Sequence, residues 1–252
     1  MLYIIQVGHN DASDRYIRNK VKAIEEAGMQ ATVVNLEEDC TTDKVIQSIR
    51  MCYRCRNCKA VMVQLPLPSH VDKNAVLSSI PEHRDIDGLN PRNTKYKPLT
   101  PCAIMRWLKE QKVDLEGKMV TILGRSELVG KPLANLMIDA GATVTVCNSK
   151  THPTNRKYAI HDGDIVVSAV GKPDTISLSD AEDMLYMDDR IFIDVGINRD
   201  ENGKLCGDIS NEAKKLIEEF GGICTPVPGG VGKWTVRELV LRLAEMEGVE
   251  IS

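Results

Sequence analysis

A turn bounded by two glycines near the middle of the chain constrains the fold more than any other feature. Residues 119–123 form a short apolar run of the kind found in buried strands, and a loop follows with Gly124 and Gly130 at its ends. Residues 131–147 then show a helical pattern followed by a second run rich in β-branched side chains. A strand, a helix and a second strand in this order predict a β-α-β unit with parallel strands.

The same turn has the chemistry of a dinucleotide site. Gly124 permits a tight turn, and the helix that follows offers free N–H groups and the positive end of its dipole to a pyrophosphate. Ser126 replaces the middle glycine of G-x-G-x-x-G, so the motif is incomplete, and a purely structural strand-to-helix corner is the alternative. The register of both strands with the helix favours a cofactor site, with the binding positions Gly124, Arg125, Ser126, Val129 and Gly130.

The residues after the second strand indicate which dinucleotide is bound. An NAD site places an acid about 20 residues past the glycines to hold the ribose 2′-hydroxyl. Here the chain reads Cys147-Asn148-Ser149-Lys150-Thr151, with no acid. We therefore expect NADP, with Arg125, Ser149 and Lys150 near the 2′-phosphate. The alternative is that the two cations are ordinary solvated surface groups.

Composition excludes several classes of protein. The 252 residues suffice for one large or two smaller α/β domains, and 42% of them are apolar. The formal net charge of -4 gives no indication of nucleic-acid or membrane-surface binding. The apolar segment 1–8 is too short for a secretion signal, and no apolar run approaches a membrane span in length. We expect a cytoplasmic protein with a small-molecule partner and with neither a nucleic-acid nor a membrane partner.

Strand and helix patterns alternate along the rest of the chain, which predicts parallel sheets. The first strand covers 2–7, and a helix follows from about Asp14 to Ala27, with Asp11 and Ser13 as candidate N-caps. The other expected elements are strands at 31–36, 60–64, 165–171 and 191–196, helices at 42–51, 103–111, 212–220 and 235–247, and a hairpin or loop at 198–207.

Three of the eight cysteines are spaced C-x-x-C-x-x-C, at Cys52, Cys55 and Cys58. Such a run can begin an iron–sulfur ligand set, but no further cysteine follows between Lys59 and Leu99. The period of three also allows the thiols to share one side of a helix end as small buried apolar groups. We expect structural thiols and no metal, and a metal site is the alternative.

Several specific strings follow one another along nearly the whole chain. They are Val7-Gly8, Ser13-x-x-Tyr16-x-x-x-Lys20, Val63-Gln64-Leu65-Pro66-Leu67-Pro68, Asp85-x-Asp87-Gly88, Gly124-Arg125-Ser126-x-x-Val129-Gly130, Asp194-Val195-Gly196-Ile197-Asn198, Gly207-Asp208 and Thr225-Pro226-Val227-Pro228-Gly229-Gly230-Val231-Gly232. In order and spacing they resemble the bifunctional methylenetetrahydrofolate dehydrogenase/methenyltetrahydrofolate cyclohydrolase family, and the chain is identified as a member of it.

The resemblance implies two α/β domains with a cleft between them, the second a Rossmann-type nucleotide-binding domain, and a homodimer. Residues 1–100, completed by the C-terminal helix within 229–252, would form the folate-binding catalytic domain. Residues 101–228 would form the NAD(P)-binding domain. The implied reactions are oxidation of 5,10-methylenetetrahydrofolate to 5,10-methenyltetrahydrofolate with NADP⁺, and hydrolysis of that cation to 10-formyltetrahydrofolate.

Matching the family motifs position by position implies a catalytic group of four side chains. Lys20 matches the catalytic lysine, which would activate or polarise water beside a cationic carbon once burial shifts its pKa. Gln64 would orient this lysine, and Tyr16 would stack on the folate ring system. Asp87 would accept the amino and ring N–H groups of the pterin with its two oxygens. Outside the motif these residues would be a surface cation, a strand-end amide, a core aromatic and a turn aspartate.

The resemblance assigns further positions to substrate and cofactor. Ser13 would cap a helix and also contact the folate, and Pro228, Gly229 and Gly232 would shape the folate pocket. Ile197 is assigned to the cofactor.

Two segments depart from the family pattern. The segment Asn90–Leu99 is shorter than its counterpart in the family, and Lys233-Trp234 replaces a Pro-Met pair. A single-activity dehydrogenase with little cyclohydrolase activity, and a non-catalytic folate- or nucleotide-binding protein, are therefore the alternatives to a bifunctional enzyme. The joint presence of Lys20 and Gln64 argues against the binding protein, which would not need this pair.

Overall fold

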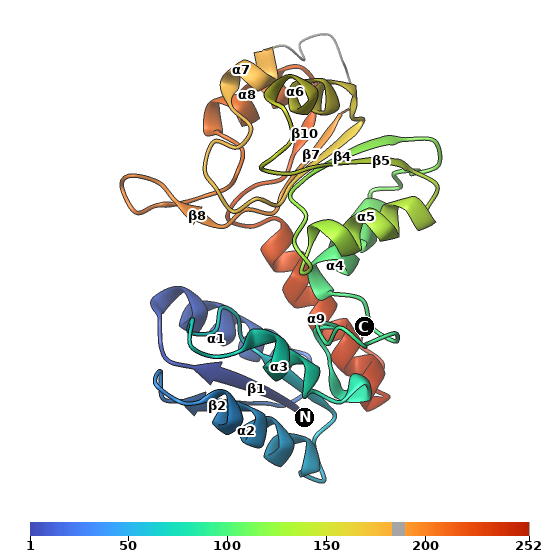
Figure 1. Cartoon of the computed structure of the whole chain (residues 1–252). Coiled ribbons are helices and arrows are strands. Elements are labelled where there is room, and N and C mark those ends of the chain that lie inside the picture. The colour runs from blue at the N-terminus through green and yellow to red at the C-terminus, as the bar shows by residue number, and fades with distance from the viewer. Residues whose placement is uncertain (183–189, 252) are drawn as a thin grey trace. The chain divides into compact units, whose positions relative to one another are not determined.

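The computed structural model describes residues 1–182 and 190–251, which divide into two compact units (Figure 1). Unit 1 contains residues 1–99 and the chain from Val236 on, and unit 2 contains residues 100–235. Each unit is built on a parallel sheet. The predicted fold class, two α/β domains, is confirmed, whereas the predicted division of folate and nucleotide binding between them stays a prediction. Within the described ranges, no helix is both long and apolar enough to cross a membrane.

Unit 1 is a three-stranded parallel sheet in the order β2-β1-β3. Its strands are β1 (Leu2–Val7), β2 (Ala31–Leu36) and β3 (Ala60–Val63). Its helical elements are α1 (Asp11–Glu26), α2 (Thr42–Arg54), α3 (Lys73–Ser78), the 3-10 turn η1 (Glu82–Arg84) and, from Val236 on, α9 (Val231–Glu247).

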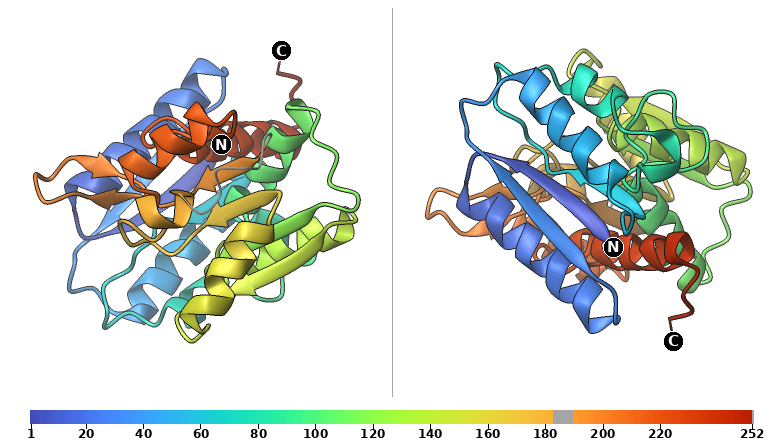
Figure 2. Two further views of the ribbon diagram at one scale, coloured as in Figure 1. Left: turned by 90° about the horizontal axis from the view of Figure 1, so that it is seen from above. Right: turned by 90° about the horizontal axis from the view of Figure 1, so that it is seen from below.

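Helices cover both faces of this sheet, and the central strand β1 is apolar on both. Leu2 and Ile4 pack in one cluster with α1 and α9, while Ile5 and Val7 pack in a second cluster with α2 and α3. Figure 2 shows these layers, with α1 and α9 on one side of the strands and α2 on the other. A near-continuous apolar run is what a parallel strand buried on both faces requires.

Helix α1 begins at Asp11, three residues earlier than predicted. Its N-cap is Asn10, whose side chain accepts a hydrogen bond from the backbone N–H of Ser13. The prediction that Asp11 or Ser13 is the N-cap is therefore wrong, because both lie inside the first turn. The extended backbone of Asn10 allows its short side chain to reach a first-turn N–H group, as an N-cap must.

Unit 2 is a five-stranded parallel sheet in the order β10-β7-β6-β4-β5. From β4 the chain crosses to β5 on one side, and β6 and β7 lie on the other side of β4, so the strand order reverses at the β4–β6 pair. Rossmann-type sheets bind ligands outside the carboxyl ends of the strands at such a point. The strands are β4 (Met119–Leu123), β5 (Thr143–Cys147), β6 (Ile165–Ser168), β7 (Ile191–Asp194) and β10 (Ile223–Cys224).

Helices also cover both faces of the second sheet. α4, α5 and the first turn of α9 pack on one face, and α6, α7 and α8 pack on the other. The predicted hairpin at 198–207 is confirmed as the antiparallel pair β8 and β9. These elements are α4 (Leu99–Glu110), α5 (Gly130–Asp139), α6 (Pro153–Asp162), α7 (Leu178–Glu182), α8 (Asn211–Glu219), β8 (Asn198–Arg199) and β9 (Leu205–Cys206).

The departure at Lys233-Trp234 has a packing role in unit 2. The indole of Trp234 stacks on that of Trp107 in α4, with ring centroids 4.5 Å apart and planes 14° apart. Offset aromatic pairs at this distance stabilise beyond the area that they bury. The start of α9 is thereby joined to α4.

Candidate active site

The four predicted catalytic side chains all belong to unit 1, and two of them contact the buried amine of a third. Lys20 lies on α1 and is 5% exposed. Its Nζ donates to Oε1 of Gln64 at 3.1 Å and lies 3.2 Å from Sδ of Met62. The ring centroid of Tyr16, one helical turn earlier, lies 4.4 Å from Nζ. The spacing on α1 and the end of β3 therefore bring Tyr16, Lys20 and Gln64 together.

Asp87 is coupled to this group electrostatically. Asp87 is half-buried, and burial raises the pKa of its carboxyl group to about 6. The positive charge of Lys20 acts in the opposite direction and lowers this pKa, but its effect is smaller. Asp85 adds to the rise and Arg242 opposes it. Burial lowers the pKa of Lys20, and the charge of Asp87 opposes that shift. Burial also raises the pKa of Tyr16. Shifts that bring an amine and a carboxyl toward neutral pH are typical of sites that bind or move protons.

The loop that carries Asp87 is built by the neighbouring acid, Asp85. This side chain is fully buried and accepts hydrogen bonds from the backbone N–H groups of Gly88 and Asn90 at 3.1 and 2.8 Å. It also accepts from Nδ2 of Asn93 at 2.9 Å. Both Asp85 oxygens are thus used to fold the loop. Sequence reasoning gave Asp85 no role, although an acid three residues before a glycine is a common turn signal.

Ser13 lies in the first turn of α1, one turn before Tyr16. Its N–H donates to Oδ1 of Asn10 at 2.8 Å, and its hydroxyl accepts from Nδ2 of the same residue at 3.0 Å. The residue is 8% exposed. Ser13 therefore forms the capping pair together with Asn10, and its contact with a folate stays a prediction.

Both glycines of the turn in unit 2 are required by close approaches. Gly124 has a φ of +110°, and a Cβ there would lie 2.4 Å from the carbonyl oxygen of Ala169. A Cβ on Gly130 would lie 2.2 Å from the carbonyl oxygen of Gly124. The first glycine lets β4 approach the loop after β6, and the second lets the turn close onto α5. The turn therefore lies at the point where the strand order reverses.

Ser126 has a structural role inside this turn. Its hydroxyl accepts from the N–H of Val129 at 3.2 Å, and its carbonyl oxygen accepts from the N–H of Lys131 at 3.1 Å. Pro132 follows and has no N–H. The N–H groups of Val129 and Lys131 are thus already bonded, which differs from the expectation of free donors at this helix start. Arg125 is exposed in the same turn and supplies a cation.

A second turn follows β5. Oδ1 of Asn148 accepts from the N–H of Lys150 at 2.9 Å, and Oγ1 of Thr151 accepts from the N–H of Asn148 at 2.9 Å. Asn148 and Thr151 thus fold the turn and leave the side chains of Ser149 and Lys150 exposed. Together these two side chains present a hydroxyl and an ammonium group without an acid.

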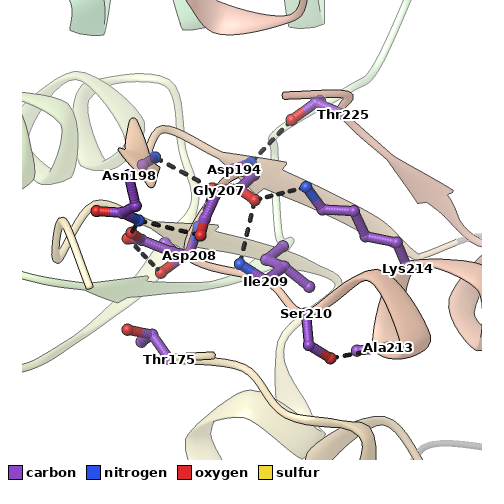
Figure 3. Close-up of polar contacts among 12 residues, drawn as sticks. Thr175, Asp194, Asn198, Gly207, Asp208, Ile209, Ser210, Ala213, Lys214 and Thr225 are labelled. Atoms are coloured by element: carbon purple, nitrogen blue, oxygen red, sulfur yellow. Dashed lines mark hydrogen bonds and ion pairs between the residues drawn. The ribbon is translucent and has the colours of Figure 1, made fainter. Parts of the chain in front are cut away.

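Two buried carboxylates organise the loops beside the glycine turn (Figure 3). Oδ2 of Asp208 accepts from the hydroxyl of Ser168 at 2.9 Å. The backbone N–H groups of 170–172 donate to its two oxygens at 2.8, 3.1 and 3.0 Å. Nδ2 of Asn198 donates to Oδ1 at 2.9 Å. Asp208 therefore fixes the loop after β6, whose Ala169 carbonyl approaches Gly124.

Asp194, at the end of β7, is satisfied in the same way. Its Oδ1 accepts from the N–H groups of Gly196 and Asp208 at 3.1 and 2.8 Å. Its Oδ2 accepts from the N–H of Ile209 at 3.1 Å and lies 2.8 Å from Nζ of Lys214. Several donors offset the cost of burying each carboxylate. Figure 3 shows the two acids side by side at the centre of this network, which we call the carboxylate hub (Asp194 and Asp208).

Two glycines make room for the hub. A Cβ on Gly196 would lie 2.0 Å from Oδ1 of Asp208, and a Cβ on Gly207 would lie 1.9 Å from Oδ2 of Asp194. The strings Asp194-Val195-Gly196 and Gly207-Asp208 therefore act as one unit. The sequence motifs contain both strings but assign them no role. The acid close to a glycine in each string was the signal that could have indicated a buried carboxylate.

Two family models match the chain in the order of the two units. The model of the tetrahydrofolate dehydrogenase/cyclohydrolase catalytic domain matches residues 1–87. The model of the NAD(P)-binding domain of the same family matches residues 98–249. The chain belongs to the tetrahydrofolate dehydrogenase/cyclohydrolase family. The family predicted from the sequence motifs is thus confirmed.

Individual members of this family are similar over almost the whole chain. The bifunctional protein FolD of Cupriavidus necator is 39% identical, over 97% of this chain and 86% of the relative. A crystal structure of FolD from Campylobacter jejuni has a TM-score of 0.89 at 35% identity, covering 98% of this chain and 87% of that one. The Trypanosoma brucei enzyme complexed with NADP cofactor and inhibitor has a TM-score of 0.88 at 32% identity, covering 97% and 85%.

The cysteine run of this tetrahydrofolate dehydrogenase/cyclohydrolase divides between core and surface. Cys52 and Cys58 are buried in the second cluster of unit 1, as expected for structural thiols, but Cys55 is exposed. The expectation that all three are buried is wrong for Cys55, because α2 ends at Arg54 and the chain turns away. Burial raises the pKa of Cys52 to about 11. Among the described residues, no three His, Cys, Asp or Glu side chains form a group that could hold a metal ion.

The remaining predicted positions lie in unit 2. Ile197 is 65% exposed between β7 and β8. Pro228 is exposed and Gly229 has a φ of +114° in the segment between β10 and α9. Gly232 lies in the first turn of α9 with open space at its Cα. Their contacts with folate or cofactor stay predictions.

Proposed function

We propose that the chain oxidises 5,10-methylenetetrahydrofolate to 5,10-methenyltetrahydrofolate with NADP⁺ and hydrolyses the product to 10-formyltetrahydrofolate. The observation that carries the proposal is the buried amine of Lys20, held by Gln64 at 3.1 Å and coupled to Asp87. Family membership supports both reactions. A protein that only bound folate or nucleotide would gain nothing from a buried amine without an anionic hydrogen-bond partner.

For the hydrolysis, we assign to Lys20 the activation of water. The water oxygen bonds to the cationic carbon while the electron pair of the C=N bond moves to nitrogen, and the water loses a proton, which a neutral amine accepts and an ammonium group does not. The bond from this carbon to N5 then breaks, its electron pair stays on N5, and N5 takes up a proton, which leaves the formyl group on N10. Burial lowers the pKa of Lys20 and so increases the neutral fraction. Gln64 fixes Nζ through a neutral acceptor, so it orients the amine without restoring its positive charge.

For substrate binding, we assign the pterin to Asp87 and the ring stacking to Tyr16. A carboxylate accepts two parallel N–H donors, and this arrangement fixes the orientation of a planar heterocycle. Asp85 already holds the loop, so Asp87 is the acid that remains for a ligand. Ser13, Pro228, Gly229 and Gly232 are further proposed folate positions.

For the oxidation, we assign the dinucleotide to the glycine turn of unit 2. NADP⁺ supplies the hydride acceptor when it is bound. Gly124, Ser126, Val129 and Gly130 would shape the pyrophosphate site, Arg125, Ser149 and Lys150 would hold the 2′-phosphate, and Ile197 would contact the cofactor. The exposed cations and the absence of an acid in 147–151 support a 2′-phosphate in this position.

We also propose a cytoplasmic homodimer. β5 is an edge strand of its sheet, and Val146 on it is 37% exposed, so a row of strand groups is available for a second copy. Light scattering after size-exclusion chromatography measures the mass directly, and a mass of one chain would contradict the dimer.

An absorbance assay of the wild-type protein tests the function. Methylenetetrahydrofolate is supplied with NADP⁺ or NAD⁺ in a non-nucleophilic buffer, and formation and loss of the methenyl cation are followed separately. We expect both steps, with kcat/KM about tenfold higher or more for NADP⁺, the scale of one charge-assisted contact. Equal values for the two cofactors would contradict the 2′-phosphate assignment. Formation without enzymatic loss would leave a dehydrogenase alone, and no formation would contradict the proposal.

A further inference from the structure

Arg242 on α9 joins the two segments that frame Asp87. The guanidinium is buried, and the residue is 6% exposed. Its Nη1 donates to the carbonyl oxygen of Ile86 at 2.9 Å and to that of Lys97 at 2.8 Å. Ile86 directly precedes Asp87, so one cation on the C-terminal helix bonds the backbone immediately beside the proposed pterin acid.

The two segments also touch each other. Gly88 has a φ of +67°, and a Cβ there would lie 2.6 Å from the carbonyl oxygen of Lys97. The N–H of Leu99 donates to the carbonyl oxygen of Asp87 at 3.3 Å. The short segment Asn90–Leu99 thus returns directly against the Asp87 loop, and Arg242 bridges the place where they meet.

Arg242 is itself held on two sides. Its Nη2 lies 3.7 Å from Oε1 of Glu238, one helical turn earlier, and its guanidinium carbon lies 5.3 Å from the ring centroid of Tyr96. An acid and an aromatic face are the partners that a buried guanidinium requires. The planar fork is therefore fixed in the orientation that reaches both carbonyl groups.

We propose that Arg242 is the positioning residue for Asp87 and sets the place of that carboxylate for folate binding. The inference rests on the proposed role of Asp87 and deepens it. Arg242 acts through the backbone of Ile86 and Lys97, and it touches no reacting atom. The C-terminal helix of unit 1 thereby determines folate affinity from outside the catalytic group.

The ionisable groups that face Asp87 come from three elements. Lys20 and Tyr16 belong to α1, Asp85 to its own loop, and Arg242 to α9. Lys20 and Arg242 lower the pKa of Asp87, whereas burial and Asp85 raise it. Removal of the Arg242 cation therefore raises the pKa of Asp87 and moves its protonation toward neutral pH.

Three variants test the proposal in the full-length protein. Arg242→Met removes the fork and the charge, Arg242→Lys keeps the charge without the fork, and Arg237→Met removes an exposed guanidinium from the same helix as a control. For each we measure the KM for methylenetetrahydrofolate, the KM for NADP⁺, kcat, thermal unfolding, and the pH profile of kcat/KM.

For Arg242→Met we expect the folate KM to rise about tenfold or more, with a smaller change in kcat and none in the NADP⁺ KM. The acid limb of kcat/KM should move to higher pH. In Arg242→Lys the folate KM should rise while the acid limb stays in place, and Arg237→Met should match the wild type. Unchanged folate KM and acid limb in a folded Arg242→Met protein would overturn the proposal.

The outcome is separable from that of the proposed function. If wild-type protein does not turn over methylenetetrahydrofolate, the proposed function fails. If the wild type is active and Arg242→Met has the same folate KM and acid limb, only the role of Arg242 is contradicted. A purely structural role would lower the unfolding temperature and leave the acid limb in place. If Arg242→Met does not fold, Arg242→Lys carries the test through the folate KM, and an unchanged value there would overturn the proposal.

Discussion

The loop after η1, which carries Asp85 and Asp87, and the carboxylate hub each contain a pair of aspartates, but the two pairs have different roles. In the hub, the oxygens of Asp194 and Asp208 all accept hydrogen bonds from the surrounding loops. In the loop, Asp85 alone is used in this way, and Asp87 stays half-buried with a pKa raised to about 6. A carboxylate whose oxygens all accept hydrogen bonds from the protein has a structural role. A carboxylate that lies near charged groups but accepts no such bonds is available to a ligand.

The first test of this comparison breaks the reactive group. Lys20→Met keeps the length of the side chain and removes the amine, so we expect cyclohydrolase activity to fall at least about 100-fold, the scale of general acid–base catalysis. Dehydrogenase activity should fall less, because hydride transfer needs no proton taken from water. Separate measurement of methenyl formation and hydrolysis checks this. Hydrolysis at the wild-type rate would mean that Lys20 does not activate water.

The second test breaks the hub. Asp208→Asn replaces one carboxylate oxygen by an NH2 group, which then faces the N–H groups that donated to that oxygen. The loop after β6 loses an acceptor, and we expect the free energy of unfolding to decrease by about 3 kcal/mol. Urea unfolding at neutral pH measures the change. Folate KM in the remaining folded protein should stay near the wild-type value, because none of the residues that donate to the Asp208 carboxylate is a proposed folate position. A decrease in the free energy of unfolding of less than about 1 kcal/mol would show that the hub has no structural role.

The third test concerns pH. Because the pKa of Asp87 is raised to about 6, kcat/KM for the folate should fall as pH drops below about 6, when the acid is protonated and accepts fewer N–H groups. Asp87→Asn should have low activity throughout and should lack this limb. A wild-type profile that is flat between pH 5 and pH 7, spanning the value at which about half is protonated, would contradict the assignment.

The smallest expected effect contrasts the two acids of the loop. Asp85→Asn should destabilise by about 2 kcal/mol, since the amide keeps only one of the two oxygen acceptors and places an NH2 donor against N–H groups that pointed at the other. For Asp87 the sign is opposite, because an acid whose folded pKa lies above its unfolded value of 3.8 stabilises below that value and loses this contribution as pH rises through about 6. Asp87→Asn should therefore stabilise most at pH 8, less at pH 5, and be near neutral only below about pH 4, the unfolded pKa. Equal losses for both variants would remove the distinction.

The fold was predictable because its signals are local. The alternation of apolar runs with helical periodicity was enough for the parallel sheets, and the spacing of Tyr16 and Lys20 already placed them on one helix face. The glycines at 124 and 130 predicted a tight turn. In the structure each is required because a backbone carbonyl group lies where its Cβ would be. Helix ends were less predictable, because several neighbouring polar residues could each serve as the N-cap. The backbone conformation, which the sequence does not show, selects Asn10 among them.

The parts that could not be predicted depend on contacts between distant residues. The bonds from Arg242 to Ile86 and Lys97 span 156 and 145 residues, and the bond from Asp208 to Ser168 spans 40. Nothing local marks such partners, so the sequence gives no pattern to read. Ser126 shows the reverse case, in which a position expected to serve a ligand proves to bind its own turn. The folate and cofactor contacts stay predictions of the motif matches.

The packing of α9 has a consequence for how the chain acquires its structure during synthesis. Leu239 and Leu243 belong to the same cluster as Leu2 and Ile4, and the amino group of Met1 pairs with Glu247. Strand β1 is therefore translated long before α9, the helix that completes its core. Unit 2, continuous from 100 to 235, is complete before α9 is, so the domain translated second is the first that can finish folding.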